Sequence, residues 1–523
     1  MKKIPTLFSK ETLKYFIFIL LLLIPVGIMF YTSSVLSLNG HELWLPYGRN
    51  FFNPEHGRYI GTAFERFCLE QLPLMLNVHT QDFRPTFIAS VVNLITVILF
   101  SIIAYGFLLF KKHKNKNDLI IWALCYLTAF FVFFNDHFGF LFQSDIIIFF
   151  EYTSSLIPYF ISLTVAIYLF TKQEAPSKSI FWLFLIMSFF TGLSIEFINV
   201  PYTLFLGMIT LFVAIDYFKF GKNEVKKSLL KLFIYGGLLD ILACIFYYIQ
   251  PTDHAYSEKY MFFTIWKDFF PVIFKITFTN VISLYVSLVL GIAAVCLLGK
   301  NERNQKTRFV SAIVFNTVSL LAFYVFGFYI ILCFYDMGLL LKEPRYIFLY
   351  IFTLFFQGFM VWGYAASIFK QSKRVFACEI SLILFILLAN SVYLKDYVFY
   401  LNKYRQESLY ERQRQYYIEG IMMEQVGNET LVFPKIFFDD DNASDRTLVY
   451  FLKLLHYPDF DNAYKIIIYK KSNISDFMDE DSNDLKFSKY LKHRIIKYGG
   501  VYFTNYEKTH EEEDRAFFDL TKW

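Results

Sequence analysis

The sequence lacks the features that organise small secreted proteins, zinc proteins and repeat proteins. Its six cysteines include no CxxC or other paired spacing in 523 residues, so neither a disulfide framework nor a cysteine zinc site is expected. No repeat of roughly 20–50 residues is visible, which argues against solenoids and propellers. Charged residues are also few, at 18% of the chain.

Apolar residues take the place of the missing charge. Hydrophobic residues make up 56% of the chain, aromatic residues 21%, and the mean hydropathy is +0.42. Runs of about 18 or more residues with few charges recur, and each is long enough to cross a hydrocarbon core roughly 30 Å thick. The sequence therefore predicts a multi-pass integral membrane protein.

About eleven such runs are predicted to cross the membrane. They are residues 15–31, 87–110, 119–134, 155–170, 180–195, 200–215, 232–249, 281–298, 309–334, 346–369 and 376–394. The first run follows a basic stretch, as in a signal peptide, but it is long and lacks a clear small-residue cleavage site. It is therefore expected to remain as the first helix.

The charge of the connecting segments predicts the orientation. Basic segments follow every second helix: "KKHKNKND" at residue 111, "TKQEAPSK" at 171, "KFGKNEVKKSLLK" at 219, "KNERNQKTR" at 300 and "KQSKR" at 370. Because Lys and Arg gather in the cytoplasmic loops of membrane proteins, these segments and the basic N-terminus are expected to be cytoplasmic. The chain is then placed in the plasma (inner) membrane, with everything after about residue 396 outside.

Two domains are expected from this topology. Residues 1–395 form a multi-pass transmembrane domain with a large first extracytoplasmic loop at 32–86, and residues 396–523 form an extracytoplasmic C-terminal domain. In that tail, the strand-like runs "TLVF" at Thr430 and "KIIIYK" at Lys465 alternate with a helical pattern that Ser444 is placed to cap. The predicted fold class is an all-α polytopic membrane protein with a small α/β extracytoplasmic C-terminal domain.

The predicted cytoplasmic loops are short and hold no nucleotide-binding pattern. They contain no Walker motif, no dinucleotide glycine pattern and no DxD motif placed for a nucleotide-sugar. Any chemistry is therefore expected on the outer face, where nucleotide donors are not normally present. An enzyme that works there needs a substrate delivered by membrane lipid, and no nucleic acid partner, metal or other cofactor is expected.

Four groups of polar residues border the predicted outer surface. The first loop holds Glu42, Glu55, His56 and Arg58; Asp136 and His137 follow the third helix, and Glu151 and Tyr152 precede the fourth. Glu196 and Asn199 lie in a very short turn between the fifth and sixth helices, and Arg345 precedes the tenth.

These residue types suit transfer chemistry on a phosphate-linked substrate. Carboxylates act as general bases on hydroxyl groups, and arginines bind phosphate through two parallel hydrogen bonds. For any single loop residue, a solvated charge is the simpler interpretation, and Arg345 is equally suited to anchor its helix at the interface. Asp240 lies within the seventh helix, away from these groups, either in a structural pair or facing a cavity.

Several of these features resemble the C-type glycosyltransferase superfamily, whose members use polyprenyl-phosphate-linked sugars. The long first outer loop, the many helices and the outer C-terminal domain carry the broad resemblance. More narrowly, "GRYIG", "EYTSSLIPYF", "SIEFINVPY" and "EPRYIF" are similar in order and spacing to an uncharacterised bacterial family of multi-pass glycosyltransferases. The paired acidic motif usual after the first helix is replaced by "HELW", so Glu55 or Glu65 are alternatives to Glu42 as the base.

The resemblance implies sugar transfer from a polyprenyl-phosphate donor to a glycan acceptor at the outer leaflet. Glu42, Glu55 and Glu151 are the candidate catalytic residues, and Arg58 and Arg345 would bind the lipid phosphate. The remaining substrate-binding candidates are His56, Asp136, His137, Tyr152, Glu196 and Asn199. A glycan polymerase or ligase, or a transporter or flippase of lipid-linked glycans, remains an alternative.

Overall fold

The computed structural model describes the chain in separate ranges. These are residues 84–111, 116–133, 153–249, 303–323 and 348–368, three strands at 430–434, 465–469 and 515–519, and the short pieces 13, 15–23, 27, 63, 67, 289–293 and 295–296. The chain divides into two compact units, of which the larger contains the described helices and the smaller contains the strands.

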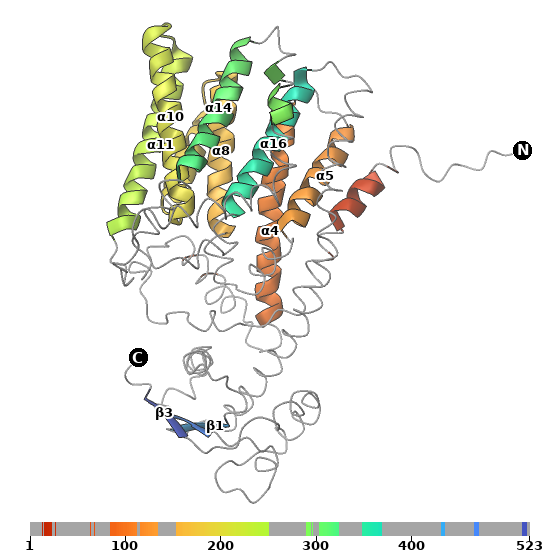
Figure 1. Cartoon of the computed structure of the whole chain (residues 1–523), viewed down its shortest axis with the longest axis vertical. Helices are drawn as coiled ribbons and strands as arrows, with labels where there is room; N and C mark the ends of the chain where they lie inside the picture. The colour runs from red at the N-terminus through yellow and green to blue at the C-terminus, as the bar shows by residue number, and fades with distance from the viewer. Residues whose placement is uncertain are drawn as a thin grey trace, which may run out of the picture. The chain divides into compact units, whose positions relative to one another are not determined.

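The described part of the larger unit consists mainly of long helices (Figure 1). They are α4 (Arg84–Leu109), α5 (Lys116–Phe133), α8 (Ser154–Lys172), α9 (Lys178–Gly192), α10 (Glu196–Lys219), α11 (Glu224–Ile249), α14 (Arg303–Ala322) and α16 (Phe348–Ile368). Each lies within or overlaps one of the apolar runs predicted to cross the membrane. The run at 376–394 lies outside the described residues, so the count of eleven crossings stays a prediction.

Helices α8 to α11 form a continuous antiparallel bundle because the turns between them are short. Gln173 ends α8 in the left-handed conformation (φ 55°) and donates its backbone N–H to Leu169 O at 2.9 Å. Ser177 begins α9 by accepting the Ile180 N–H. Gly221, at φ 109°, supplies the backbone angle that the α10–α11 turn requires. Neighbouring helices therefore run in opposite directions.

Other helices pack against this bundle. Helix α14 contacts α10 and α8, while α4 contacts α8, α5 and α16. Helix α16 approaches α4 closely at Gly363, which has no Cβ atom. A Cβ atom added there would lie only 2.0 Å from Phe107 O. Aromatic side chains fill the interior between these helices, with the Phe309 and Tyr364 rings stacked 4.4 Å apart. Small residues at helix contacts are typical of packing in membranes.

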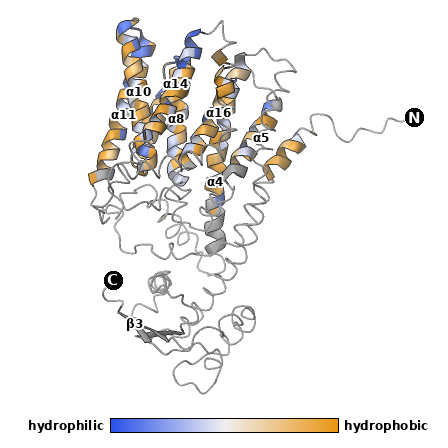
Figure 2. Ribbon diagram, in the orientation of Figure 1, coloured by the Kyte–Doolittle hydropathy of each residue, from blue (hydrophilic) through white to orange (hydrophobic). Residues whose placement is uncertain are grey.

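Among the described residues, four helices are long and apolar enough to cross a membrane: Ser154–Lys172, Phe197–Lys219, Glu224–Tyr247 and Leu349–Ser367. The hydropathy of the helices is shown in Figure 2. The apolar stretch of α16 is 94% buried, whereas that of α11 is 33% buried. Helix α16 is therefore enclosed by protein, and α11 presents Tyr235, Leu238, Leu242 and other apolar side chains to its surroundings.

The smaller unit contains a three-stranded sheet in the order β1-β2-β3. Strand β1 (Thr430–Pro434) pairs in parallel with β2 (Lys465–Tyr469), and β2 pairs antiparallel with β3 (Arg515–Asp519). The two strand-like runs at Thr430 and Lys465 are therefore strands. The helix that Ser444 was predicted to cap lies outside the described residues, so the α/β domain as a whole stays a prediction.

Candidate functional site

Most of the predicted site residues lie outside the described part of the chain. These are Glu42, Glu55, His56, Arg58, Asp136, His137, Glu151, Tyr152 and Arg345. The backbone of Glu196 and the whole of Asn199 are described, and both belong to the start of α10. The structure therefore allows one of the four predicted groups to be placed, namely the turn between α9 and α10.

Residues 193–195 form this turn, and Glu196 and Asn199 follow it rather than lie in it. Ile195 is extended (φ −60°, ψ 155°), and the Ile198 and Asn199 N–H groups both donate to its carbonyl. The Ile195 carbonyl thus already accepts helical bonds, so α10 begins earlier than the apolar pattern of residues 200–215 predicted.

The fully buried Asn199 side chain joins the end of α9 to the start of α10. Its Nδ2 donates to Gly192 O at 3.3 Å and to Ser194 O at 2.9 Å. Carbonyl groups at the end of a helix have no helical partner, and leaving them buried without one is costly. Asn199 therefore fixes the turn that positions Glu196, which is a structural role in addition to any contact with substrate.

Asp240 of α11 lies beside this same turn. Its Oδ2 lies 2.6 Å from Thr203 Oγ1, within hydrogen-bond distance, and a Cβ atom added at Gly192 would lie 3.0 Å from its Oδ1. Thr203 in turn lies 2.9 Å from Asn199 O. The sequence had placed Asp240 away from the candidate groups, whereas the structure brings it to the turn that Asn199 stabilises.

The depth of these residues follows from helix geometry. Gly192 lies 14 residues from Lys178, and Thr203 lies 16 residues from Lys219. Asp240 lies 16 residues from Glu224, the first residue of α11. At 1.5 Å per residue, the three lie about 21–24 Å from the end of the bundle that carries the basic turns. This common depth is a signal in the sequence from which their proximity could have been predicted.

Further polar contacts cross the interior among the same helices. The hydroxyl groups of Ser188 in α9 and Tyr202 in α10 share a hydrogen bond of 2.8 Å. The hydroxyl oxygen of Tyr159 in α8 lies 3.3 Å from Thr353 Oγ1 in α16. The Tyr159 and Tyr202 rings meet edge to face with centroids 6.0 Å apart. Asp240 is thus one of several buried polar groups that lie among these helices.

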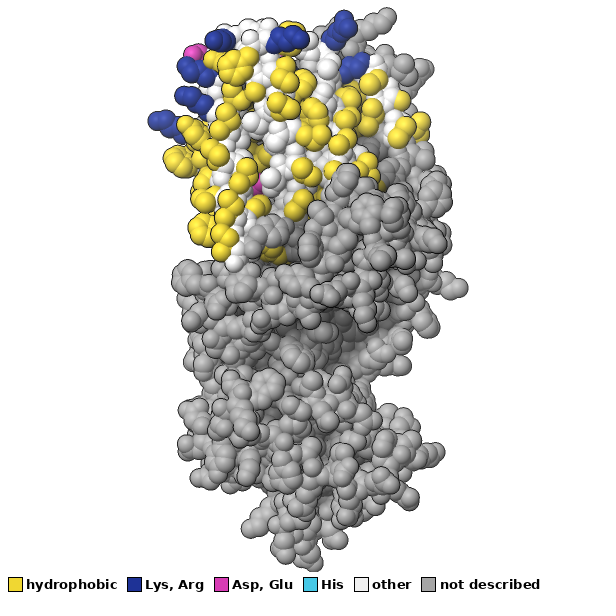
Figure 3. Space-filling model, turned by 60° about the vertical axis from the view of Figure 1, so that its left-hand side comes forward, with side chains coloured by type: hydrophobic (Ala, Val, Ile, Leu, Met, Phe, Trp, Pro, Cys, Tyr) yellow, Lys and Arg dark blue, Asp and Glu magenta, His cyan; other side chains and the backbone are white. Residues whose placement is uncertain are grey.

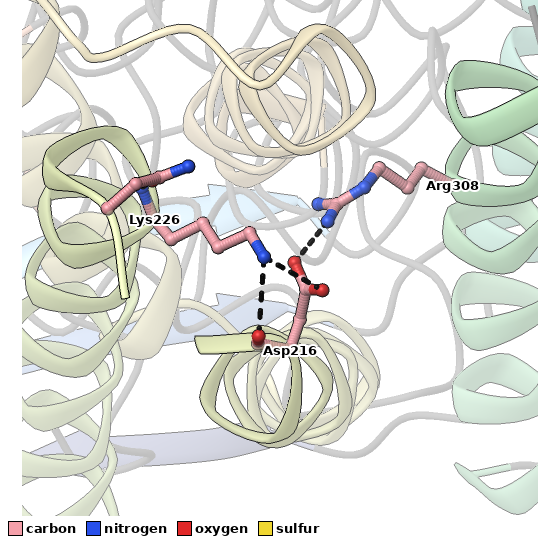
Figure 4. A network of polar contacts seen from close by, with 4 residues as sticks. Asp216, Lys226 and Arg308 are labelled. Carbon is pink, nitrogen blue, oxygen red and sulfur yellow. Dashed lines mark hydrogen bonds and ion pairs between the residues drawn. The ribbon is translucent and has the colours of Figure 1, made fainter. Parts of the chain in front are cut away.

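A cluster of charged side chains lies at the opposite end, where α8, α10, α11 and α14 meet. Asp216 forms ion pairs with Arg308 and with Lys226, whose Nζ lies 3.3 Å from Oδ1 (Figure 4). The Arg308 guanidinium also lies 5.5 Å from the centroid of the Phe170 ring. With its amide oxygen turned toward the guanidinium, Gln173 accepts from Arg308 Nε at 3.0 Å.

Basic side chains gather around this cluster. Figure 3 shows Lys and Arg at one edge of the described surface, with hydrophobic side chains covering the surface beyond them. Lys172, Lys178, Lys219, Lys226, Lys227 and Arg303 all lie at or near these helix ends. The described bundle therefore has a basic end and, opposite it, the end that carries Glu196 and Asn199.

Metal coordination receives no support from the described residues, which contain no group of three or more His, Cys, Asp or Glu side chains placed as ligands.

Comparison of the chain with protein-family models, with curated proteins and with solved structures gives no significant match. The class of protein therefore follows from the fold alone: the described helices fit a membrane-embedded all-α protein.

Proposed function

We propose that the protein is an integral membrane glycosyltransferase that moves a sugar from a polyprenyl-phosphate donor to a cell-envelope glycan or lipid. The proposal includes about eleven crossings of the plasma membrane, a cytoplasmic N-terminus and an extracytoplasmic α/β domain at residues 396–523. The observation that supports it is the separation of polar groups along the bundle, with basic side chains at one end and Glu196 and Asn199 at the other.

The separation of charge favours an outward-facing site. Basic helix ends are retained on the cytoplasmic side, so the α9–α10 turn belongs to the outer side in this proposal. A sugar donor that reaches the outer side without nucleotide must be held by a lipid carrier. A lipid-linked sugar phosphate places its reacting carbon at the membrane surface. In this proposal the first residues of α10 lie at the same surface.

The proposed roles follow from the chemistry of the transfer. A carboxylate of Glu42, Glu55 or Glu151 removes the proton of the acceptor hydroxyl as that oxygen attacks the anomeric carbon. The bond to the lipid phosphate breaks, and Arg58 and Arg345 stabilise the charge that develops on the phosphate. Bound sugar contacts His56, Asp136, His137, Tyr152 and Glu196, while Asn199 positions Glu196 through the α9–α10 turn.

Two related functions remain as alternatives. A glycan polymerase or ligase uses the same kind of donor and differs in moving whole oligosaccharides. A transporter or flippase is favoured by one observation, the burial of Asp240 about 24 Å from the basic end. Acids at membrane depth commonly mark ion or substrate paths.

The test is sugar transfer in proteoliposomes that contain a polyprenyl-phosphate-linked sugar and a glycan acceptor. Glu42→Gln and Glu55→Gln are expected to abolish release of polyprenyl phosphate. Glu224→Gln is the matched control, because Glu224 is exposed at the basic end and pairs only with the neighbouring Lys227. Full activity in the Glu42→Gln, Glu55→Gln double variant would show that neither carboxylate is the catalytic base. Movement of intact donor across the bilayer without sugar transfer would instead establish transport.

A further inference from the structure

Thr203 makes two short contacts, and one hydroxyl hydrogen can point directly along only one of them. Its Oγ1 lies 2.6 Å from Asp240 Oδ2 and 2.9 Å from the backbone oxygen of Asn199. A hydroxyl group carries one hydrogen, and an ionised carboxylate and a backbone carbonyl are both acceptors only. Both contacts are therefore separate, well-aligned hydrogen bonds only if a second hydrogen lies between Thr203 and Asp240, and the carboxyl group is the one that can carry it.

The surroundings of Asp240 favour the same arrangement. The side chain is fully buried, and its Oδ1 has no hydrogen-bond partner. Ion pairs in the described part of the chain involve Asp118, Asp216 and Glu224, and none of them includes Asp240. A buried carboxylate without a counter-charge is strongly unfavourable, whereas the neutral acid requires only hydrogen bonds.

The described groups that face Asp240 are uncharged. On α11 itself, Cys244 Sγ lies 3.6 Å from Thr203 Oγ1. Helix α10 contributes Thr203 and the Tyr202 ring, whose hydroxyl is bonded to Ser188 of α9. Helix α9 contributes Gly192, against which Oδ1 lies. No described neighbour on these helices supplies a positive charge.

We propose that Asp240 is a proton-binding site within the membrane. The proton resides on Oδ2 and is donated to Thr203 Oγ1, and the Thr203 hydroxyl donates in turn to Asn199 O. Because the Asn199 side chain holds the α9–α10 turn through Gly192 and Ser194, the bound proton joins α11 to that turn. Loss of the proton removes one hydrogen bond and adds a buried charge, so it weakens the packing of α11 against α9 and α10. This proposal does not depend on sugar transfer.

Infrared spectroscopy of the purified protein in lipid bilayers tests the protonation directly. At neutral pH the wild type is expected to show a carboxylic acid C=O band that Asp240→Asn removes. Asp118→Asn is the control, because Asp118 forms an ion pair of 2.5 Å with Lys111 and should contribute no such band. Thr203→Val should shift the Asp240 band to higher frequency, since the acid loses its acceptor, whereas Thr210→Val should not, because Thr210 donates only to Leu206 O.

The pH dependence of stability provides a second measurement. An unfolded aspartate releases its proton near pH 3.9, so the folded protein binds one more proton than the unfolded chain at neutral pH. Stability relative to Asp240→Asn is therefore expected to fall as pH rises, by up to about tenfold in the unfolding constant per pH unit. A neutral-pH spectrum without a band that depends on Asp240, or parallel pH profiles for the two proteins, would overturn the proposal.

Discussion

At the scale of single residues, Gly192 is a point of close contact between α9 and α11. A Cβ atom added there would lie 2.5 Å from the backbone oxygen of Asp240 and 2.8 Å from Ala243 Cβ. The backbone of α11 cannot withdraw from such a contact without moving the whole helix. Only glycine therefore permits α9 and α11 to pack at the depth of Asp240.

Gly192→Ala is expected to lower the free energy of unfolding by roughly 1–3 kcal/mol, the usual cost of overpacking. Gly207→Ala is the matched control, because no atom lies within 4 Å of a Cβ added at Gly207 in α10. That substitution should be neutral or stabilising by up to about 1 kcal/mol. Reversible unfolding in detergent micelles measures both, and equal stability of the two variants would contradict the close contact.

Residue types alone revealed part of the candidate site. Glu196 and Asn199 stood out as polar residues between two apolar runs, and their place beside the α9–α10 turn was predicted to within a few residues. The hydrogen bonds of Asn199 to Gly192 and Ser194 were not predictable, because they depend on where α9 ends. Thr203 was not singled out, since a lone threonine in an apolar helix has no distinctive pattern.

At the scale of helices, the ion pairs around Asp216 join three elements at the basic end. Arg308 of α14 is 92 residues from Asp216 in the chain, and Lys226 belongs to α11. All three side chains are largely buried, with 10–15% of each exposed. The cluster thus carries two positive charges against one negative charge, and Asp216 is the group that makes their approach favourable.

Asp216→Asn is expected to destabilise the protein by roughly 3–5 kcal/mol, because it leaves the Arg308 and Lys226 charges without their carboxylate. Glu224→Gln should cost no more than about 1 kcal/mol, since its pair with Lys227 is exposed. Thermal unfolding at low salt compares the two. Similar losses in both variants would mean that the Asp216 cluster contributes no more than a surface pair.

The apolar runs predicted the positions of the helices well, but they predicted the residues at which the helices begin and end less well. The structure begins α10 at Glu196 and α11 at Glu224, earlier than the runs at 200–215 and 232–249 indicated. Polar and charged residues at these ends interrupt the apolar pattern, yet they continue the backbone hydrogen bonds of the helix. Hydropathy therefore locates the membrane-buried part of a helix better than the helix itself.

At the scale of the whole molecule, Lys and Arg side chains gather at one end of the described bundle (Figure 3). The turn that joins α10 to α11 contains Lys222 and is flanked by Lys219, Lys226 and Lys227 in the two helices, whereas the turn that joins α9 to α10 contains no lysine. Since Lys and Arg are retained on the cytoplasmic side, this difference is the physical basis of the proposed orientation.

The orientation predicts which engineered cysteines are labelled in intact cells by a maleimide that cannot cross membranes. In a cysteine-free variant, Asn473→Cys in the tail is expected to react from outside, and Lys222→Cys in the α10–α11 turn should react only after the membrane is opened. Lys222 is exposed, so its side chain is accessible once reagent enters. Labelling of Lys222→Cys in intact cells would reverse the orientation and, with it, the proposed outer site.

The sequence by itself determined that apolar helices build this protein, roughly where they lie, and which of their ends are basic. Those properties are sums over neighbouring residues, so they can be read along the chain. The tertiary structure alone decided that Asp240 meets Thr203 beside the Asn199 turn, and that Arg308 meets Asp216. Such contacts depend on which faces of distant helices pack together, and hydropathy is nearly the same on every face of an apolar helix.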